Sequence, residues 1–102
     1  MDHLIFAYGT LKDPRIRKEV TGRDIEAKED IIAGFCMDKI ILDCIEYPIL
    51  TPCTTLKNSV QGVVFTVNDN ELKDIDKYES DAYQRIKVRL TSGIDAWVYV
   101  KP

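Results

Sequence analysis

The sequence lacks the long apolar run that a membrane-spanning helix requires. No stretch of its 102 residues approaches the roughly 18 to 20 consecutive apolar residues needed to cross a bilayer. Residues 1 to 11 carry Asp2 and His3 where a secretory signal peptide would have a basic start. We therefore expect a cytoplasmic protein with no membrane partner.

Residues that bind metals are scarce. His3 is the single histidine, and the three cysteines Cys36, Cys44 and Cys53 form no Cys-x-x-Cys pair, which disfavours a zinc site. The cysteines are odd in number and lie eight and nine residues apart, which also argues against a disulfide framework. We therefore expect free thiols, no metal and no cofactor.

Basic residues show no concentration that would suit nucleic acid. The formal net charge is -3, and the densest basic run, from Lys12 to Arg23, is short and interspersed with acids. A phosphate-binding surface requires a continuous basic stripe. Nucleic acid is therefore excluded as an expected partner.

Length and composition fit one globular domain. Hydrophobic residues make up 45% of the chain and charged residues 30%, an ordinary balance for a folded protein. A chain of this size rarely divides into smaller domains and can bury a modest core unaided. We expect a single domain over residues 1–102, present as a monomer or a weak homodimer.

The first third of the chain reads as a strand, a turn and a short helix. The apolar run Leu4 to Tyr8 is too short for a helix and is followed by Gly9, as expected of a buried strand. Asp13 before Pro14 is a helix-start signal, because the aspartate can cap and proline suits the first helical position. The predicted helix runs from Pro14 to about Val20 and ends near Gly22.

The middle of the chain is harder to interpret. Residues 25–40 are rich in apolar side chains, and Gly34 indicates a bulge or a close backbone contact within one strand. Ile40 to Leu50 forms a second apolar stretch. Pro48 and Pro52 restrict it to an edge strand or an irregular one. Val60 to Val67 is a clearer strand.

The last third predicts a helix and a hairpin. Asn68 lies three residues before Glu71, the spacing at which each side chain can satisfy the other's backbone amide, so a helix should run from Asp69 to about Tyr78. Residues 83–90 and 96–100 alternate apolar and polar side chains, as in paired strands that turn at Ser92-Gly93. The mixed order of elements favours an α+β domain.

Glu79 is the candidate acid-base residue. At roughly 100° per residue it projects between Leu72 and Ile75 on the apolar face of the predicted helix. Asp76 borders that face, whereas Asp74 points to solvent. Burial would raise the pKa of Glu79 toward neutrality, where a carboxyl group can take up and return protons. The alternative is a fraying last turn in which the side chain bends to water.

The loop Tyr8-Gly9-Thr10-Leu11 is the candidate binding segment. A glycine between a buried strand and a helix allows a sharp turn that leaves several amides free for an anionic oxygen. Thr10 adds a hydroxyl group. The loop lacks the further glycines and the lysine of nucleotide-binding loops. The alternative is that this segment is only a turn and binds no ligand.

Arg85 and Tyr83 are weaker candidates for the site. Arg85 lies on the polar face of its predicted strand, two residues after Tyr83. It could bind a substrate carboxylate, or it could pair with an acidic residue of the fold. Trp97 and Tyr99 are expected to pack within their strand.

Several motifs together resemble the gamma-glutamylcyclotransferase-like family in order and spacing, from about Leu4 to Tyr99. These motifs are Phe6 to Leu11, Tyr47-Pro48, Val60 to Phe65, Ile75 to Glu79 with Tyr83 to Arg85, and Ala96 to Tyr99. The segment from Asp13 to Arg23 is more similar to the branch with plant avirulence-induced proteins than to the gamma-glutamylamine branch. Ser80 departs from the family, which commonly has glycine there.

The resemblance implies a fold, a reaction and a site. The fold is a small mixed β-barrel of about five to seven strands flanked by two short helices. In the reaction, the α-amine of a small gamma-glutamyl compound attacks its own side-chain carbonyl, which gives 5-oxoproline and releases an amine. Glu79 would be the general acid-base, and Tyr8, Gly9, Thr10 and Leu11 would bind the substrate, without metal or cofactor.

Two non-enzymatic alternatives stay open at this stage. One is a binding module that holds a small carboxylate on the same fold and catalyses nothing. The other is an interaction protein in which Val60 to Val67 forms an exposed edge strand that pairs with a partner chain.

Overall fold

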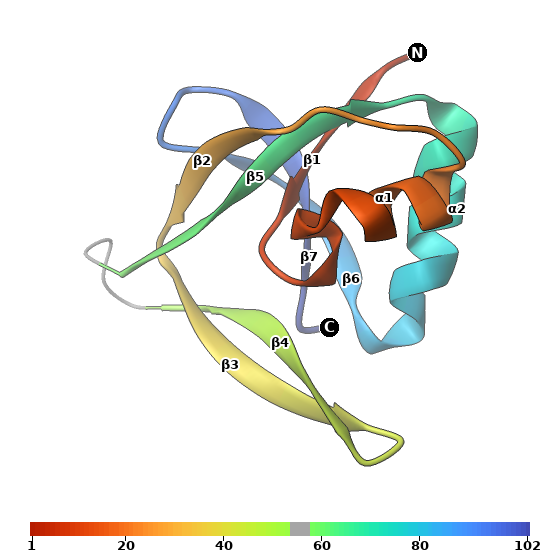
Figure 1. Ribbon diagram of the computed structural model, residues 1–102. Helices are drawn as coiled ribbons and strands as arrows, with labels where there is room; N and C mark the ends of the chain where they lie inside the picture. The colour runs from red at the N-terminus through yellow and green to blue at the C-terminus, as the bar shows by residue number, and fades with distance from the viewer. Residues whose placement is uncertain (54–57) are drawn as a thin grey trace.

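The computed structural model describes residues 1–53 and 58–102 (Figure 1). In these residues seven strands are accompanied by two α-helices and two short 3-10 helices. The elements are β1 (His3–Ala7), η1 (Thr10–Lys12), α1 (Pro14–Thr21), β2 (Lys28–Ala33), β3 (Phe35–Leu42), β4 (Ile45–Pro52), β5 (Ser59–Val67), α2 (Asp69–Glu79), η2 (Ser80–Ala82), β6 (Gln84–Arg89) and β7 (Asp95–Val100).

The strands form two sheets, which confirms the α+β class. Five strands are ordered β2-β5-β1-β7-β6, and β3 pairs with β4 in a separate two-stranded sheet. The larger sheet is mixed, because β1 is antiparallel to β5 and parallel to β7. The expected barrel is not fully closed. A backbone hydrogen bond of 2.9 Å from Thr91 to the Ile31 carbonyl links the β6–β7 turn to edge strand β2.

The predicted strand over residues 25–40 is two strands that belong to different sheets. Gly34 lies between them with φ 82°, a conformation that glycine adopts without steric cost. There the chain leaves the five-stranded sheet and enters the β3–β4 hairpin (Figure 1). The predicted strand from Ile40 to Leu50 in fact contains the hairpin turn at Asp43 and Cys44, which have φ values of 52° and 66°.

The segment from Val60 to Val67 is not an exposed edge strand. It lies in β5, whose neighbours β2 and β1 pair with it on both sides. Its backbone groups are therefore already used in the sheet, and the proposed pairing of this strand with a partner chain is wrong.

Two hydrophobic clusters lie on opposite faces of the larger sheet. Side chains alternate along β1 and the residue that follows it, so Phe6 and Tyr8 lie in one cluster and Ile5 and Ala7 in the other. The second cluster also contains Leu72 and Ile75 of α2, and Figure 1 shows α1 and α2 together on that side of the sheet. The two short helices therefore cover one face, as the amphipathic pattern of α2 predicts.

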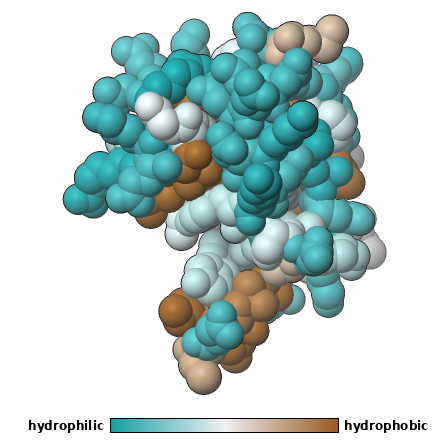
Figure 2. Space-filling view, turned by 90° about the vertical axis from the view of Figure 1, so that its right-hand side faces the viewer, coloured by the Kyte–Doolittle hydropathy of each residue, from teal (hydrophilic) through white to brown (hydrophobic). Residues whose placement is uncertain are grey.

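The β3–β4 hairpin extends from the body of the molecule and exposes apolar side chains. Met37, Ile41 and Ile45 have exposed fractions of 47%, 69% and 54%. Figure 2 shows hydrophobic side chains gathered at the lower end of the molecule, where this hairpin lies. None of the helices in the described part of the chain is long and apolar enough to cross a membrane.

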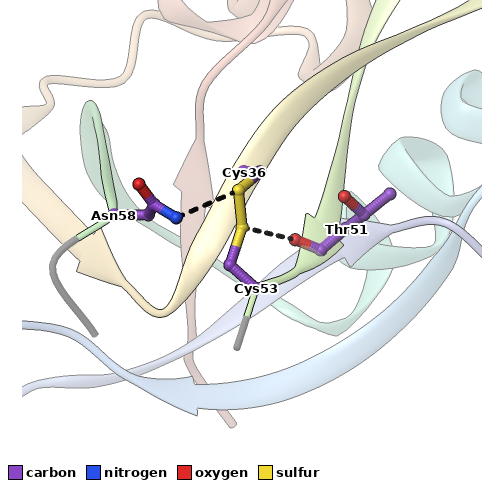
Figure 3. Close-up of a disulfide and its surroundings, with 4 residues drawn as sticks. All are labelled: Cys36, Thr51, Cys53 and Asn58. Carbon is purple, nitrogen blue, oxygen red and sulfur yellow. Dashed lines mark hydrogen bonds between the residues drawn. A yellow bond between two sulfur atoms is a disulfide. The ribbon is translucent and has the colours of Figure 1, made fainter. Parts of the chain in front are cut away.

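Cys36 and Cys53 form a disulfide, which overturns the expectation of three free thiols (Figure 3). The pairing of β3 with β4 places Cys36 opposite Thr51, two residues from Cys53, and the two Cα atoms are 5.7 Å apart. A count of cysteines contains no information on this strand register. Cys44, in the hairpin turn, is an exposed free thiol.

Candidate functional site

A pocket of about 220 Å³ lies where β1 ends, between the following loop, the last turn of α2 and the tip of the β3–β4 hairpin. Tyrosines and small apolar groups dominate its surface. The lining residues are Ile5, Phe6, Ala7, Tyr8, Gly9, Thr10, Leu11, Leu42, Asp43, Tyr47, Pro48, Tyr78, Glu79, Ser80, Tyr83 and Tyr99. The pocket therefore contains every predicted site residue except Arg85.

Glu79 is the last residue of α2 and lines the pocket. The helix is capped by Asn68, whose side chain accepts a hydrogen bond from the Glu71 amide, while the Glu71 carboxylate accepts one from the Asn68 amide. Buried Leu72 and Ile75 hold the helix against the sheet, and they fix the direction in which Glu79 projects. Burial raises the pKa of Glu79 from its ordinary value to about 7.

The Tyr8 to Leu11 loop forms the opposite part of the lining. Leu11 is 2% exposed and packs in the core, and the Tyr8 hydroxyl donates to the Tyr99 carbonyl. The Thr10 hydroxyl shares a hydrogen bond of 2.6 Å with the Tyr78 hydroxyl, which links the loop to α2. Both ends of the loop are therefore fixed.

The loop leaves three amides free. The backbone N–H groups of Gly9, Thr10 and Leu11 have no backbone acceptor among the described residues, because the first amides of a helical turn have no partner within it. A Cβ atom at Gly9 would lie 3.2 Å from Cγ of Pro48. Glycine therefore keeps this side of the pocket open.

Tyr83 lines the pocket and ties it to the hairpin. Its hydroxyl donates a hydrogen bond of 2.8 Å to the Pro48 carbonyl of β4. Burial, with a smaller contribution from the nearby Glu79 carboxylate, raises the pKa of Tyr83 to about 12. Tyr83 is therefore a neutral hydrogen-bonding group near Glu79.

Arg85 is not among the residues that line the pocket. Its guanidinium group donates two hydrogen bonds to Asp76, of 3.0 and 3.1 Å, and lies 4.2 Å from the centre of the Trp97 ring. Asp76 also accepts a hydrogen bond of 2.6 Å from the Tyr99 hydroxyl. Arg85 therefore forms an ion pair with Asp76 within the fold and does not reach the pocket.

Leu42, Asp43 and Tyr78 are among the lining residues that the sequence did not indicate as site residues. Tyr78 lies on the exposed side of α2, and its hydroxyl has a partner only because the β1 loop folds against that side. Leu42 and Asp43 reach the site through the hairpin. A hairpin turn at Asp43 and Cys44 would have indicated that Leu42 and Asp43 lie at the tip of a hairpin, but these residues fall inside the strand predicted from Ile40 to Leu50. Within the described ranges, no group of three or more histidine, cysteine or acidic side chains could hold a metal ion.

An open mixed sheet with two helices on one face and a pocket beside a strand-end loop defines an α+β protein. The chain matches the family model described as gamma-glutamyl cyclotransferase, AIG2-like, over residues 5–102. It belongs to this family. No curated protein matches the chain.

Solved structures share the fold at low sequence identity. A protein from Arabidopsis thaliana, solved in solution, is 23% identical with a TM-score of 0.81; the match covers 99% of this chain and 62% of that one. A structure described as gamma-glutamyl cyclotransferase is 18% identical with a TM-score of 0.81, and the match covers 100% and 68%. A mouse AIG2-like protein is 19% identical with a TM-score of 0.75, covering 98% and 77%.

Proposed function

We propose that the chain catalyses the intramolecular cyclisation of a gamma-glutamyl amino acid or amine to 5-oxoproline, with release of the amine. The observation that carries the proposal is Glu79, a partly buried carboxyl group with its pKa raised to about 7, in the same pocket as the Tyr8 to Leu11 loop. A group with a pKa near the working pH can both accept and donate a proton during one reaction. Family membership agrees with this chemistry.

Each step of the reaction has a residue that can assist it. Ionised Glu79 takes a proton from the α-ammonium group, and the free amine attacks the side-chain carbonyl carbon to form the new C–N bond. The carbonyl oxygen carries negative charge in the tetrahedral intermediate. Protonated Glu79 then returns its proton to the leaving nitrogen as the original C–N bond breaks. The ring nitrogen loses its second proton to solvent as the neutral lactam forms, and the released amine takes up one proton from solvent, so the proton balance closes and no further reactant is needed.

The free amides of Gly9, Thr10 and Leu11 would hold the substrate carboxylate or the developing oxyanion. Pre-positioned donors of this kind stabilise transition states by about 3 to 4 kcal/mol in comparable sites. Tyr83, whose hydroxyl hydrogen is donated to the Pro48 carbonyl, would form part of the wall, and Arg85 would support α2 from outside the pocket.

The alternative is a module that binds a small carboxylate without turnover. The raised pKa of Glu79 favours the enzyme, because a carboxyl group that ionises near neutral pH would weaken binding of an anion beside it. Incubation with a panel of gamma-glutamyl amino acids and amines, with 5-oxoproline as the measured product, tests the proposal. Binding without 5-oxoproline release across the panel would favour the module.

A further inference from the structure

Arg17 of α1 is a buried arginine directly behind the binding loop. It is 5% exposed, which is rare for an arginine without an acidic partner. Its Nη1 donates to the carbonyls of Leu11 and Lys12, both at 3.0 Å, and its Nε donates to the carbonyl of Ile25 at 3.2 Å. Its guanidinium group also lies 5.4 Å from the centre of the Phe65 ring.

The charge of Arg17 is not paired with a carboxylate among the described residues. Each of its hydrogen bonds goes to a backbone carbonyl. The nearby Asp13 carboxylate instead caps α1 and pairs with Arg15 at 3.2 Å. An arginine side chain stays protonated in proteins, so a positive charge remains behind the loop.

The same hydrogen bonds fix the direction of the loop backbone. Arg17 holds the Leu11 and Lys12 carbonyls, and the amides of Lys12 and Asp13 are bonded to the Gly9 and Thr10 carbonyls at 3.1 Å. The amides that remain free are those of residues 9–11, which line the pocket. The peptide groups thus link the buried cation to the free donors.

The pocket would otherwise disfavour an anion. Its lining includes the carboxyl groups of Glu79 and Asp43 and, among the described residues, no lysine, arginine or histidine. A cation a few residues behind the loop offsets that negative charge.

We propose that Arg17 is the positioning residue that makes the Tyr8 to Leu11 loop selective for a carboxylate. The inference rests on the proposed function, in which this loop binds the substrate carboxylate or oxyanion. Arg17 does not contact the substrate. It acts by fixing the turn through the Leu11 and Lys12 carbonyls and by supplying positive potential at the free amides.

The test measures charge selectivity separately from turnover. The dissociation constants of 5-oxoproline and of its uncharged amide, 5-oxoprolinamide, are determined by calorimetry for the wild type, Arg17→Gln and Arg17→Lys. Both variants lose the three-carbonyl geometry and should lose similar thermal stability, but only Arg17→Lys keeps the charge. Arg15→Gln is the matched control, because it removes the same charge from an exposed position on the same helix.

We expect the wild type to prefer the carboxylate and Arg17→Gln to lose about tenfold of that preference. Arg17→Lys should keep most of it, and Arg15→Gln should keep all of it. A merely structural role would weaken both ligands alike and leave their ratio unchanged. An unchanged ratio in Arg17→Gln, or a wild type with no preference for the carboxylate, overturns the inference.

The proposed function and this inference can fail separately. Failure of 5-oxoproline release across the substrate panel with an intact Arg17-dependent ratio refutes only the function. If neither variant folds, the Arg17 Nε–H resonance of the wild type decides by NMR. It should shift more with 5-oxoproline than with the amide, and equal shifts would contradict the inference.

Discussion

Ser80 follows Glu79 with φ 63° and ψ -171°, a combination that is essentially restricted to glycine. The family resemblance described above implies glycine at this position, which this backbone conformation favours. In this chain the Cβ atom of Ser80 makes the conformation strained, and Ser80 lines the pocket. The departure therefore concerns backbone strain next to Glu79.

Ser80→Gly should stabilise the protein. Relief of the strained conformation contributes about 1 to 3 kcal/mol, and the greater freedom of glycine in the unfolded chain offsets about 0.5 to 1 kcal/mol. The melting temperature should rise by several degrees in thermal unfolding. The matched control is Ser59→Gly at an exposed position in β5, which should lower it. A lower melting temperature for Ser80→Gly than for the wild type would contradict the interpretation that Ser80 is strained.

Glu79→Gln should fold normally, bind the ligand and lose nearly all cyclisation. Glutamine keeps the volume of the side chain but cannot exchange protons, so the rate should fall by roughly 10²- to 10⁴-fold. In the wild type, kcat/KM should rise with pH through about 7, because the base must be ionised. Steady-state assays of 5-oxoproline release measure both effects.

Asp74→Asn is the control for that substitution. Asp74 is exposed on the same helix, whereas Asp76 is bonded to Arg85 and Tyr99 and its loss would disturb the fold. Full turnover by Glu79→Gln in an active preparation would eliminate the acid-base assignment.

At the scale of the elements, local chemistry predicted the helices and the C-terminal hairpin. Asp13 does cap α1, Gly22 ends it with φ 88°, and Asn68 and Glu71 form the predicted reciprocal cap of α2. These signals act within a few residues, so they are legible in the sequence. The same holds for Glu79, because its direction follows from helical periodicity once α2 is known.

The β3–β4 hairpin could not be predicted in the same way. Its two-residue turn needs φ > 0 at both positions, which normally favours Asn-Gly, but Asp43 and Cys44 occupy them. Asp43 suits the first of these positions but Cys44 does not suit the second, so pairing over the strands decides the turn. The disulfide and the Leu42 and Asp43 part of the pocket depend on that pairing and were missed for the same reason.

Arg85→Ala should lower the stability of the contact between β6 and α2. Arg85 joins the two elements through Asp76 and packs on Trp97. Loss of about 1 kcal/mol should lower the melting temperature by a few degrees, with little change in ligand binding. Thermal unfolding and calorimetry on the same preparation test this. An unchanged melting temperature with lost binding would assign Arg85 to the site.

The Cys36–Cys53 disulfide should stabilise the hairpin against unfolding. It closes a loop with a sequence separation of 17, for which chain entropy contributes about 3 kcal/mol. Under denaturing, non-reducing conditions thiol titration should detect Cys44 alone, and the paired substitution of Cys36 and Cys53 by serine should lower the melting temperature. If protein isolated from cells had three reactive thiols, the disulfide would not be present in the cell. That result would agree with the expected cytoplasmic location, because disulfides are rare in the cytosol.

At the scale of the whole molecule, the pKa of Glu79 links the proposed reaction to the pH dependence of folding. The pKa is about 7 in the folded protein and near 4.5 in the unfolded chain, so the folded protein binds this proton more tightly. The free energy of unfolding is therefore highest below pH 4.5 with respect to this group, and it declines as pH rises through about 7. The carboxyl group needed for catalysis thus destabilises the fold at the pH where it is ionised.

Other carboxyl groups act in a different pH range. Hydrogen bonds from Arg15, His3, Arg23 and Arg89 are the largest causes that lower the pKa values of their respective partners, which are Asp13, Asp69, Glu71 and Asp95. Their contributions to stability are present above the unfolded values of 3.8 to 4.5 and are lost as pH falls below them. Between pH 5 and 8 these four groups stay ionised in both states.

We therefore expect the melting temperature of the wild type to fall between pH 5 and 8 relative to that of Glu79→Gln. Glutamine cannot ionise, and every other titrating group is common to both proteins. The difference between the two melting temperatures at each pH therefore reports the ionisation of Glu79 alone. The gap should widen between about pH 4.5 and 7, the unfolded and folded pKa values of Glu79, and level off above pH 7, where kcat/KM also approaches its plateau. Parallel scans would mean that Glu79 titrates as an exposed glutamate, and a gap without a matching rate profile would separate the buried carboxyl group from the chemistry.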